Sequence, residues 1–387
     1  MTYNICMSFF SLLKRNKESY SLVLNISSGS ISGGIIKFTN EPGENIIYYS
    51  KEQIPFQQDL SINRHYKLMF SSLGNLIKRI RTDGLKKIPS KNGKEIQLDK
   101  VYYIFSSPWS TSQTKIIRLN EKKSFKVTTD YINKKIDELE KQFQIDVSKV
   151  GKIIEKKVIQ VIINGYPVTD YENKLATNLE IAVFFTIVPE DVLQSIETEL
   201  SKVFNIKNSW CHSSALSIFS LIRNLFPQNE DFIYIEVSEE ITDVSVIKDN
   251  VITSNVSIPM GRNNYIRELS GALKVTPEIV DSMISIKNNK SHDELANLKL
   301  SVTMDAVAQN WLTKIFDLLE GFKEKIYVPE NLYLITSPDL ASFLQDKLKK
   351  RDFKVTLVDN KKIKSAFNNC DISFKLELMF LDNLYKI

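Results

Sequence analysis

Two stretches of the chain, some two hundred residues apart, share one pattern of apolar and polar positions. SLVLNISSGSISGGIIKF at 21–38 and FIYIEVSEEITDVSVI at 232–247 each read as an apolar strand, a short polar turn and a second apolar strand. Alternation with a period of two predicts a β-strand, so each stretch predicts a β-hairpin. Asn25 of the first aligns with Glu236 of the second. The repeat indicates a duplicated fold with a cleft between two similar halves.

The rest of the chain alternates between helical and strand patterns. HYKLMFSSLGNLIKRI has helical spacing and leads, through a Lys-rich loop, to the strand VYYIF at 101–105. A strand, an amphipathic helix and two further strands follow, with a turn signal at Asn164-Gly165, and then a helix that begins near Pro189. The last residues, FKLELMFLDNLYKI, predict a strand or a packed terminus. The whole pattern is that of an α/β protein.

Composition and charge exclude several classes of function. The 387 residues carry 51 Lys and Arg against 46 Asp and Glu, a mild net charge of +5 that is spread along the chain, so we expect no nucleic-acid binding. Cys6, Cys211 and Cys370 are far apart and lack metal-site spacing, which favours a reducing cytosol. The longest apolar runs have the length of strands, so no transmembrane segment is predicted.

The N-terminal segment, residues 1–19, has two interpretations. Its positive charges follow its apolar run, which is the wrong polarity for a signal peptide. As a short amphipathic helix it would contact a membrane surface; otherwise it is a helix or tail packed on the domain. The residues that would make the membrane contact are Phe9, Phe10, Leu12, Leu13, Lys14 and Arg15.

The order of these elements resembles the actin-like ATPase superfamily, and within it the branch that contains the division protein FtsA and the pilus protein PilM. The unit at 108–205 resembles the SHS2 subdomain of that branch, and INGYPV followed by NLEIAVFF is similar to a passage of FtsA. SIPMGRNNYIREL at 257–269 and NLYLITSPDLASFLQDKL at 331–348 resemble the segments around the family's adenosine site. The resemblance covers about 20–387.

The resemblance implies an α/β, actin-like fold of two RNase-H-like lobes around a cleft, with an SHS2-like insertion. It divides the chain into an N-terminal tail or short helix at 1–19, the first part of the first lobe at 20–107, the inserted subdomain at 108–205, and the remainder of the first lobe with the second lobe at 206–387.

The resemblance also assigns positions to a nucleotide site, and many of them depart from the family. These positions are Asn25, Ser27, Ser28, Gly29, Ser30, Glu236, Ser238, Glu239, Glu240, Thr242, Gly261 and Ser337. In the family an aspartate before each turn handles Mg²⁺, and glycines let backbone N–H groups approach phosphate. Asn25 is neutral where the first aspartate is expected, and Glu236 is one methylene longer than the second.

The second turn and the adenosine segment depart further. Glu239 and Glu240 replace glycines; turned inward, each would repel a phosphate charge by about 4 kcal/mol at about 4 Å and a dielectric of about 20. The paired glycines of the adenosine loop are Ser337 and Pro338, and Arg262 stands where a second glycine is expected. We therefore expect no ATP hydrolysis, no catalytic residue, no metal ligand and no cofactor. ATP with Mg²⁺ would bind if both glutamates faced solvent and Arg262 met a phosphate.

Three functions are consistent with this pattern. The first is a non-catalytic scaffold or adaptor at the cytoplasmic face of the inner membrane, with an FtsA-like role in cell division. The second is a PilM-like cytoplasmic component of type IV pilus assembly, and the third is an active actin-like ATPase. The first two imply protein partners among division or pilus components, and the family resemblance alone suggests self-association.

Overall fold

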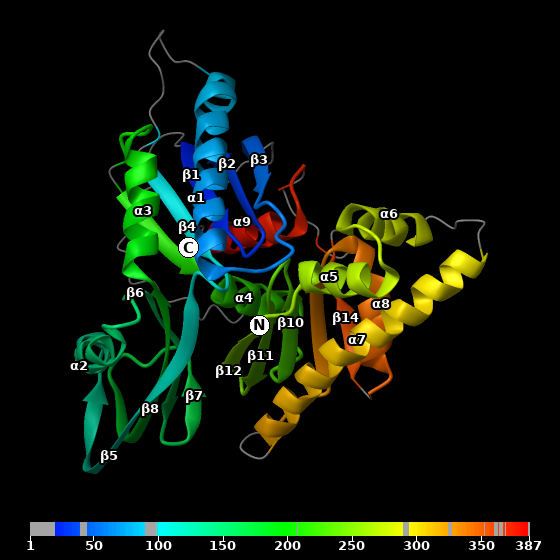
Figure 1. Ribbon diagram of the computed structural model, residues 1–387. Coiled ribbons are helices and arrows are strands. Elements are labelled where there is room, and N and C mark those ends of the chain that lie inside the picture. The colour runs from blue at the N-terminus through cyan, green and yellow to red at the C-terminus, as the bar shows by residue number, and fades with distance from the viewer. Residues whose placement is uncertain are drawn as a thin grey trace.

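The computed structural model describes residues 20–38, 45–89, 98, 100–206, 208–288, 294–323, 327–351, 353–359, 363, 367 and 369–385. Residues 1–19, with the membrane contact predicted there, lie outside this part of the chain. Its strands form two five-stranded sheets and one four-stranded sheet, which define two lobes and an insertion (Figure 1). Among the described residues, no helix is long and apolar enough to cross a bilayer.

Lobe I contains the first predicted hairpin. Its sheet has the order β3-β2-β1-β4-β9, with β4 and β9 parallel to β1. The strands are β1 (Tyr20–Ile26), β2 (Ser30–Lys37), β3 (Ile46–Gln53), β4 (Lys100–Phe105) and β9 (Asn208–Ser213). One face packs on α1 (Ile62–Arg79) and α3 (Glu190–Ser201), and α1 continues into the short turns η1 (Ile80–Gly84) and η2 (Leu85–Lys87).

Lobe II contains the second hairpin and repeats the arrangement. Its sheet has the order β12-β11-β10-β13-β14. The strands are β10 (Phe232–Val237), β11 (Thr242–Lys248), β12 (Val251–Ile258), β13 (Asn331–Thr336) and β14 (Lys354–Leu357). Its outer face is covered by α5 (Arg262–Leu273), α6 (Pro277–Asn288), α7 (Glu294–Lys323) and α8 (Pro338–Lys349).

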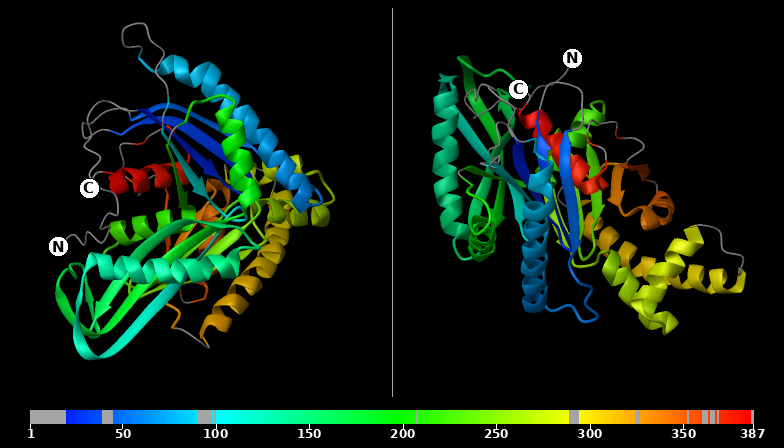
Figure 2. Two further views of the ribbon diagram at one scale, coloured as in Figure 1. Left: turned by 90° about the vertical axis from the view of Figure 1, so that its left-hand side faces the viewer. Right: turned by 90° about the horizontal axis from the view of Figure 1, so that it is seen from above.

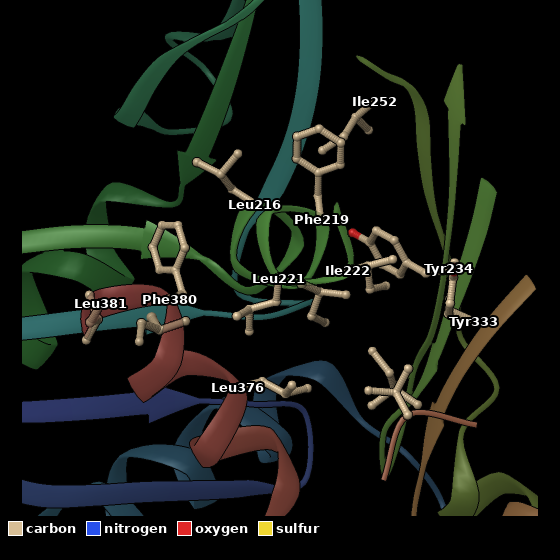
Figure 3. Packing of buried hydrophobic residues seen from close by; sticks show 14 of the residues in the cluster. Leu216, Phe219, Leu221, Ile222, Tyr234, Ile252, Tyr333, Leu376, Phe380 and Leu381 are labelled. Atoms are coloured by element: carbon tan, nitrogen blue, oxygen red, sulfur yellow. The ribbon is translucent and has the colours of Figure 1, made fainter. Parts of the chain in front are cut away.

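Two helices lie between the sheets of the two lobes. α4 (Ser214–Leu225) and α9 (Ile372–Tyr385) belong to one apolar core that includes residues of both sheets. Figure 3 shows Phe219 and Ile222 of α4 on the side of Tyr234 and Tyr333 of the lobe II sheet, and Leu216 on the opposite side of the helix. The prediction of a packed C-terminus is confirmed, but the alternative of a terminal strand is wrong, because this segment is the helix α9.

The insertion is a four-stranded sheet backed by one helix. The sheet has the order β5-β8-β6-β7 and α2 covers one face of it. The elements are β5 (Thr111–Val127), α2 (Thr129–Val147), β6 (Lys152–Ile163), β7 (Tyr166–Val168) and β8 (Lys174–Val188). Figure 2 shows the insertion and helices α5–α8 on opposite sides of the molecule. The sheet ends at Val188, and α3, inside the predicted range 108–205, packs on lobe I.

Candidate functional site

The two hairpins are built alike. β1 pairs with β2 so that Asn25 lies opposite Ser32, and β10 pairs with β11 so that Glu236 lies opposite Asp243. The same backbone hydrogen bond closes each turn, at 3.0 Å in the first hairpin and 2.9 Å in the second. The sequence alignment of the two stretches therefore corresponds to equivalent positions in the structure.

The turns of the two hairpins meet directly. The hydroxyls of Ser28 and Ser238 are 2.8 Å apart, and the backbone N–H of Glu240 donates to Ser28 Oγ at 3.0 Å. Ser28 is fully buried. Each lobe thus satisfies polar groups of the other, at the place where the family resemblance expects a phosphate between the turns.

Glu239 fills the space beside the first turn. A Cβ atom placed on Gly29 would lie 2.1 Å from Glu239 Cβ and 2.5 Å from its Cγ, so the glutamate stem rests on the bare glycine backbone. Its carboxylate accepts a hydrogen bond from Ser30 Oγ at 3.4 Å and lies 4.0 Å from Lys51 Nζ. The first turn therefore contacts a carboxylate from lobe II of the same chain, where the family resemblance predicts a phosphate.

Glu240 points inward as well, but its charge is neutralised inside the protein. It is 4% exposed, and Arg267 Nη2 donates to its carboxylate at 2.5 Å. Asn263 Nδ2 adds a second donor at 2.8 Å. The charge repulsion expected from the sequence therefore applies to Glu239, whereas Glu240 joins the second turn to α5.

Neither of the two positions where the family has an aspartate presents an exposed carboxylate, since Asn25 has none and Glu236 is buried. Asn25 donates from Nδ2 to Ser373 Oγ of α9 at 3.1 Å. Burial, followed by the nearby Asp243 and Glu377, holds the pKa of Glu236 well above its usual range. Within the described part of the chain, no cluster of three or more His, Cys, Asp or Glu side chains is suited to a metal ion.

The segments that resemble the family's adenosine site are occupied by side chains of lobe II. Gly261 caps α5 and lies so close to the second turn that a Cβ there would be 2.5 Å from Ser238 O. The cavity beside it has a volume of about 20 Å³, which is room for one water and not for a purine. Arg262 is paired with Asp339 at 2.7 Å and with Asp281, so its charge is already satisfied.

Thr242 and Ser337, two further positions that the resemblance assigns to the nucleotide site, are part of the packing and helix capping of lobe II. Thr242 is fully buried, donates to Met260 O at 2.5 Å and accepts from Trp311 Nε1 at 3.0 Å. Ser337 is the N-cap residue of α8, which begins at Pro338, a favourable position for proline. The residues present do not fit a Mg²⁺-nucleotide at either turn or at the adenosine side.

The sequence did not indicate Lys51, Asp371 or Arg267, which join the lobes. Lys51 lies 3.0 Å from Asp371, just before α9, as well as near Glu239. Arg267 contacts both lobes. No motif marks these positions, since each contact joins segments far apart in the chain. Trp109, just after β4, is 6% exposed and donates from Nε1 to Ser27 O at 2.8 Å.

Comparison with known proteins supports the architecture. No protein-family profile matches the chain, and no curated protein sequence matches it. A chain of the PilM–PilN type IV pilus biogenesis complex is similar in structure, with a TM-score of 0.59, 10% identity, and coverage of 96% of this chain and 99% of that one. The predicted actin-like ATPase fold is thereby confirmed.

Two other solved structures are more distant. A Bacteroides thetaiotaomicron protein with an actin-like ATPase fold and unknown function has a TM-score of 0.43 and 13% identity, with coverage of 94% of this chain and 96% of that one. The ethanolamine utilization protein EutJ from Carboxydothermus hydrogenoformans has a TM-score of 0.45 and 8% identity, with coverage of 88% and 85%.

Proposed function

We propose that this chain, which has the actin-like fold, is a non-catalytic scaffold whose lobes are closed by its own residues instead of by a nucleotide. The observation that carries the proposal is the Glu239 side chain seated on Gly29. Its carboxylate takes the place of a bound anion at the first turn, and the hydrogen bond between the Ser28 and Ser238 hydroxyls joins the two turns. A protein in this state acts by binding other proteins.

We further propose that these partners are pilus-type components at the cytoplasmic face of the inner membrane. The similarity over nearly the whole length to a chain of the PilM–PilN complex supports this role over the FtsA-like one. The division role keeps the support of the INGYPV and NLEIAVFF passage. Both roles call for a surface that receives a segment of a membrane-anchored protein.

Helix α1 offers such a surface at its N-terminal end. Ile62 is 86% exposed and Leu60 is 44% exposed, and the half-buried Tyr66 and Phe70 continue the helical face that Ile62 begins. We call Leu60, Ile62, Tyr66 and Phe70 the α1 surface. α1 contains basic residues and no acidic one. This combination fits a partner segment with apolar anchors and acidic neighbours.

Calorimetry with Mg-ATP and Mg-ADP tests the nucleotide-free state. We expect no heat with the unmodified protein up to millimolar nucleotide. Glu239→Gly clears the first turn and Glu239→Gln removes only the charge, so binding gained by the first alone would identify steric filling as the cause. Micromolar binding by the unmodified protein, with hydrolysis that collapses in Glu236→Ala, would restore the active ATPase.

Co-purification tests the partner surface. The chain would be expressed with the cytoplasmic segments of the membrane-anchored pilus and division proteins of the same genome. Ile62→Glu should abolish capture, whereas Ile145→Glu, at a residue 75% exposed on α2, should leave it unchanged. Equal capture by both variants would contradict the α1 surface, and selective capture of division segments would favour the FtsA-like role.

A further inference from the structure

One arginine of lobe II reaches across to the loop that leads into the α1 surface. Arg267 of α5 donates from Nη1 to Gln57 O at 3.0 Å, and its guanidinium lies 5.4 Å from the centre of the Phe56 ring. Both residues belong to the irregular segment 54–61 between β3 and α1. Ile54 N–H, at the start of the segment, donates to Gly29 O at 2.8 Å. The loop is thus fixed by the first turn and by lobe II.

The other end of this arginine is anchored in the second turn. Arg267 donates to Glu240 from both terminal nitrogens, at 2.5 and 3.3 Å. Glu240 in turn donates its backbone N–H to Ser28 in the first turn. A guanidinium stays charged and a buried carboxylate needs its partners, so this pair is a strong and directional link. Arg267 is therefore connected, through Glu240, to the contact between the two turns.

The loop passes the constraint on to the first turns of α1. Gln57 Nε2 lies 3.1 Å from His65 Nδ1, and the His65 ring stacks on Trp109 with ring centres 5.4 Å apart. Trp109 donates to Ser27 O, which returns the chain of contacts to the first turn. His65 is one residue from Tyr66 and three from Ile62. These contacts therefore pass through the loop and the first turns of α1, next to the residues of the α1 surface.

We propose that Arg267 makes the shape of the α1 surface depend on closure of the lobes, so that the contact between the turns holds this surface in its binding shape. This inference rests on the proposed partner function, and its ligand class is the same acidic, apolar peptide segment. Closure then prepares the surface in advance, which lowers the conformational cost of binding.

Arg262 provides a matched control on the same helix. Arg262 pairs with Asp339 and Asp281, which both lie in lobe II, whereas Arg267 joins lobe II to lobe I. Arg262→Met and Arg267→Met make the same chemical change five residues apart. Glu240→Gln is a third variant, which weakens the link from the second turn without altering a residue that touches the loop.

Hydrogen–deuterium exchange of the full chain tests the inference without any partner. Arg267→Met should speed exchange in residues 54–61 and 62–66 by about tenfold. The reason is that loss of a charged hydrogen bond lowers the free energy of local opening by about 1.5 kcal/mol. Glu240→Gln should act in the same direction, and Arg262→Met should leave both segments as in the unmodified protein.

Three results would overturn the inference. They are unchanged exchange in Arg267→Met, faster exchange confined to 54–61 with 62–66 unaffected, and an equal effect of Arg262→Met. Failure of the partner function would appear separately, as no capture by the unmodified protein, because the exchange measurement contains no partner.

Discussion

At the scale of single residues, the contact between Gly29 and Glu239 can be tested directly by mutation. Any Cβ there overlaps the Glu239 side chain, whose stem leaves the second turn and has little room to move. Gly29→Ala should therefore lower the free energy of unfolding by about 1–3 kcal/mol through overpacking. Urea denaturation measures this loss.

Two further variants complete that experiment. Gly74→Ala on α1 meets no atom within 4 Å, so it should be neutral or should stabilise the helix by up to about 1 kcal/mol. The double variant Gly29→Ala with Glu239→Gly removes the overlapping side chain and should recover most of the lost stability. A double variant as unstable as the single one would contradict the contact.

Glu377 on α9 predicts a pH dependence of stability. Burial raises its pKa from 4.5 to about 8, so the folded protein keeps the proton that the unfolded chain releases. Between about pH 5 and about pH 8 the free energy of unfolding then falls as pH rises, by up to about 1.4 kcal/mol per pH unit from this group. Glu377→Gln cannot ionise, so its stability advantage over the unmodified protein should grow across that window and level off above it. Denaturation at several pH values measures the difference, and a constant difference would contradict the assignment.

At the scale of elements, the insertion is tied to lobe I by a buried glutamate. Glu155 of β6 accepts from the Ser213 N–H at 3.0 Å, from Ser213 Oγ at 2.8 Å and from Thr186 Oγ1 at 3.1 Å. His212 Nδ1 lies 2.9 Å from the same carboxylate. Ser213 also caps α4, so one carboxylate fixes the junction of the insertion with β9 and α4.

Removing this carboxylate should be costly. Glu155→Ala leaves several buried donors without a partner, and we expect a loss of about 3 kcal/mol. Glu180→Ala, which breaks an exposed pair with Arg118, should change stability by less than about 0.5 kcal/mol. Thermal or urea unfolding compares the two, and similar effects would show that the Glu155 junction contributes little.

The elements also show how far sequence reasoning reaches. Both hairpins were predictable from two apolar strand patterns joined by a short polar turn, although their strands β1, β2, β10 and β11 are buried on both faces. Pattern reading fails for α9, where Lys375, Leu376, Glu377 and Leu378 alternate polar and apolar residues although the segment is helical. All four are buried between the lobes, so α9 has no polar face to reveal its helical period.

At the scale of the whole molecule, the order of elements was enough to predict the actin-like fold, since it is a property of the chain read from end to end. The contacts across the lobes were not predictable. Lys51 with Glu239 and Arg267 with Gln57 join residues about two hundred positions apart, and their pairing depends on the closed arrangement itself. The sequence indicates that the positions corresponding to the family's nucleotide site are altered, but not that the Glu239 side chain lies against Gly29.

The distance between the lobes tests the central claim most directly. Spin labels at the exposed Asn75 of α1 and Gln309 of α7, in a variant without the three native cysteines, would report it by double electron–electron resonance. We predict one narrow distance distribution that Mg-ATP leaves unchanged, because Glu239 and the serine contacts already close the lobes. A broad distribution that narrows when Mg-ATP is added would contradict the account and show that a nucleotide closes this protein.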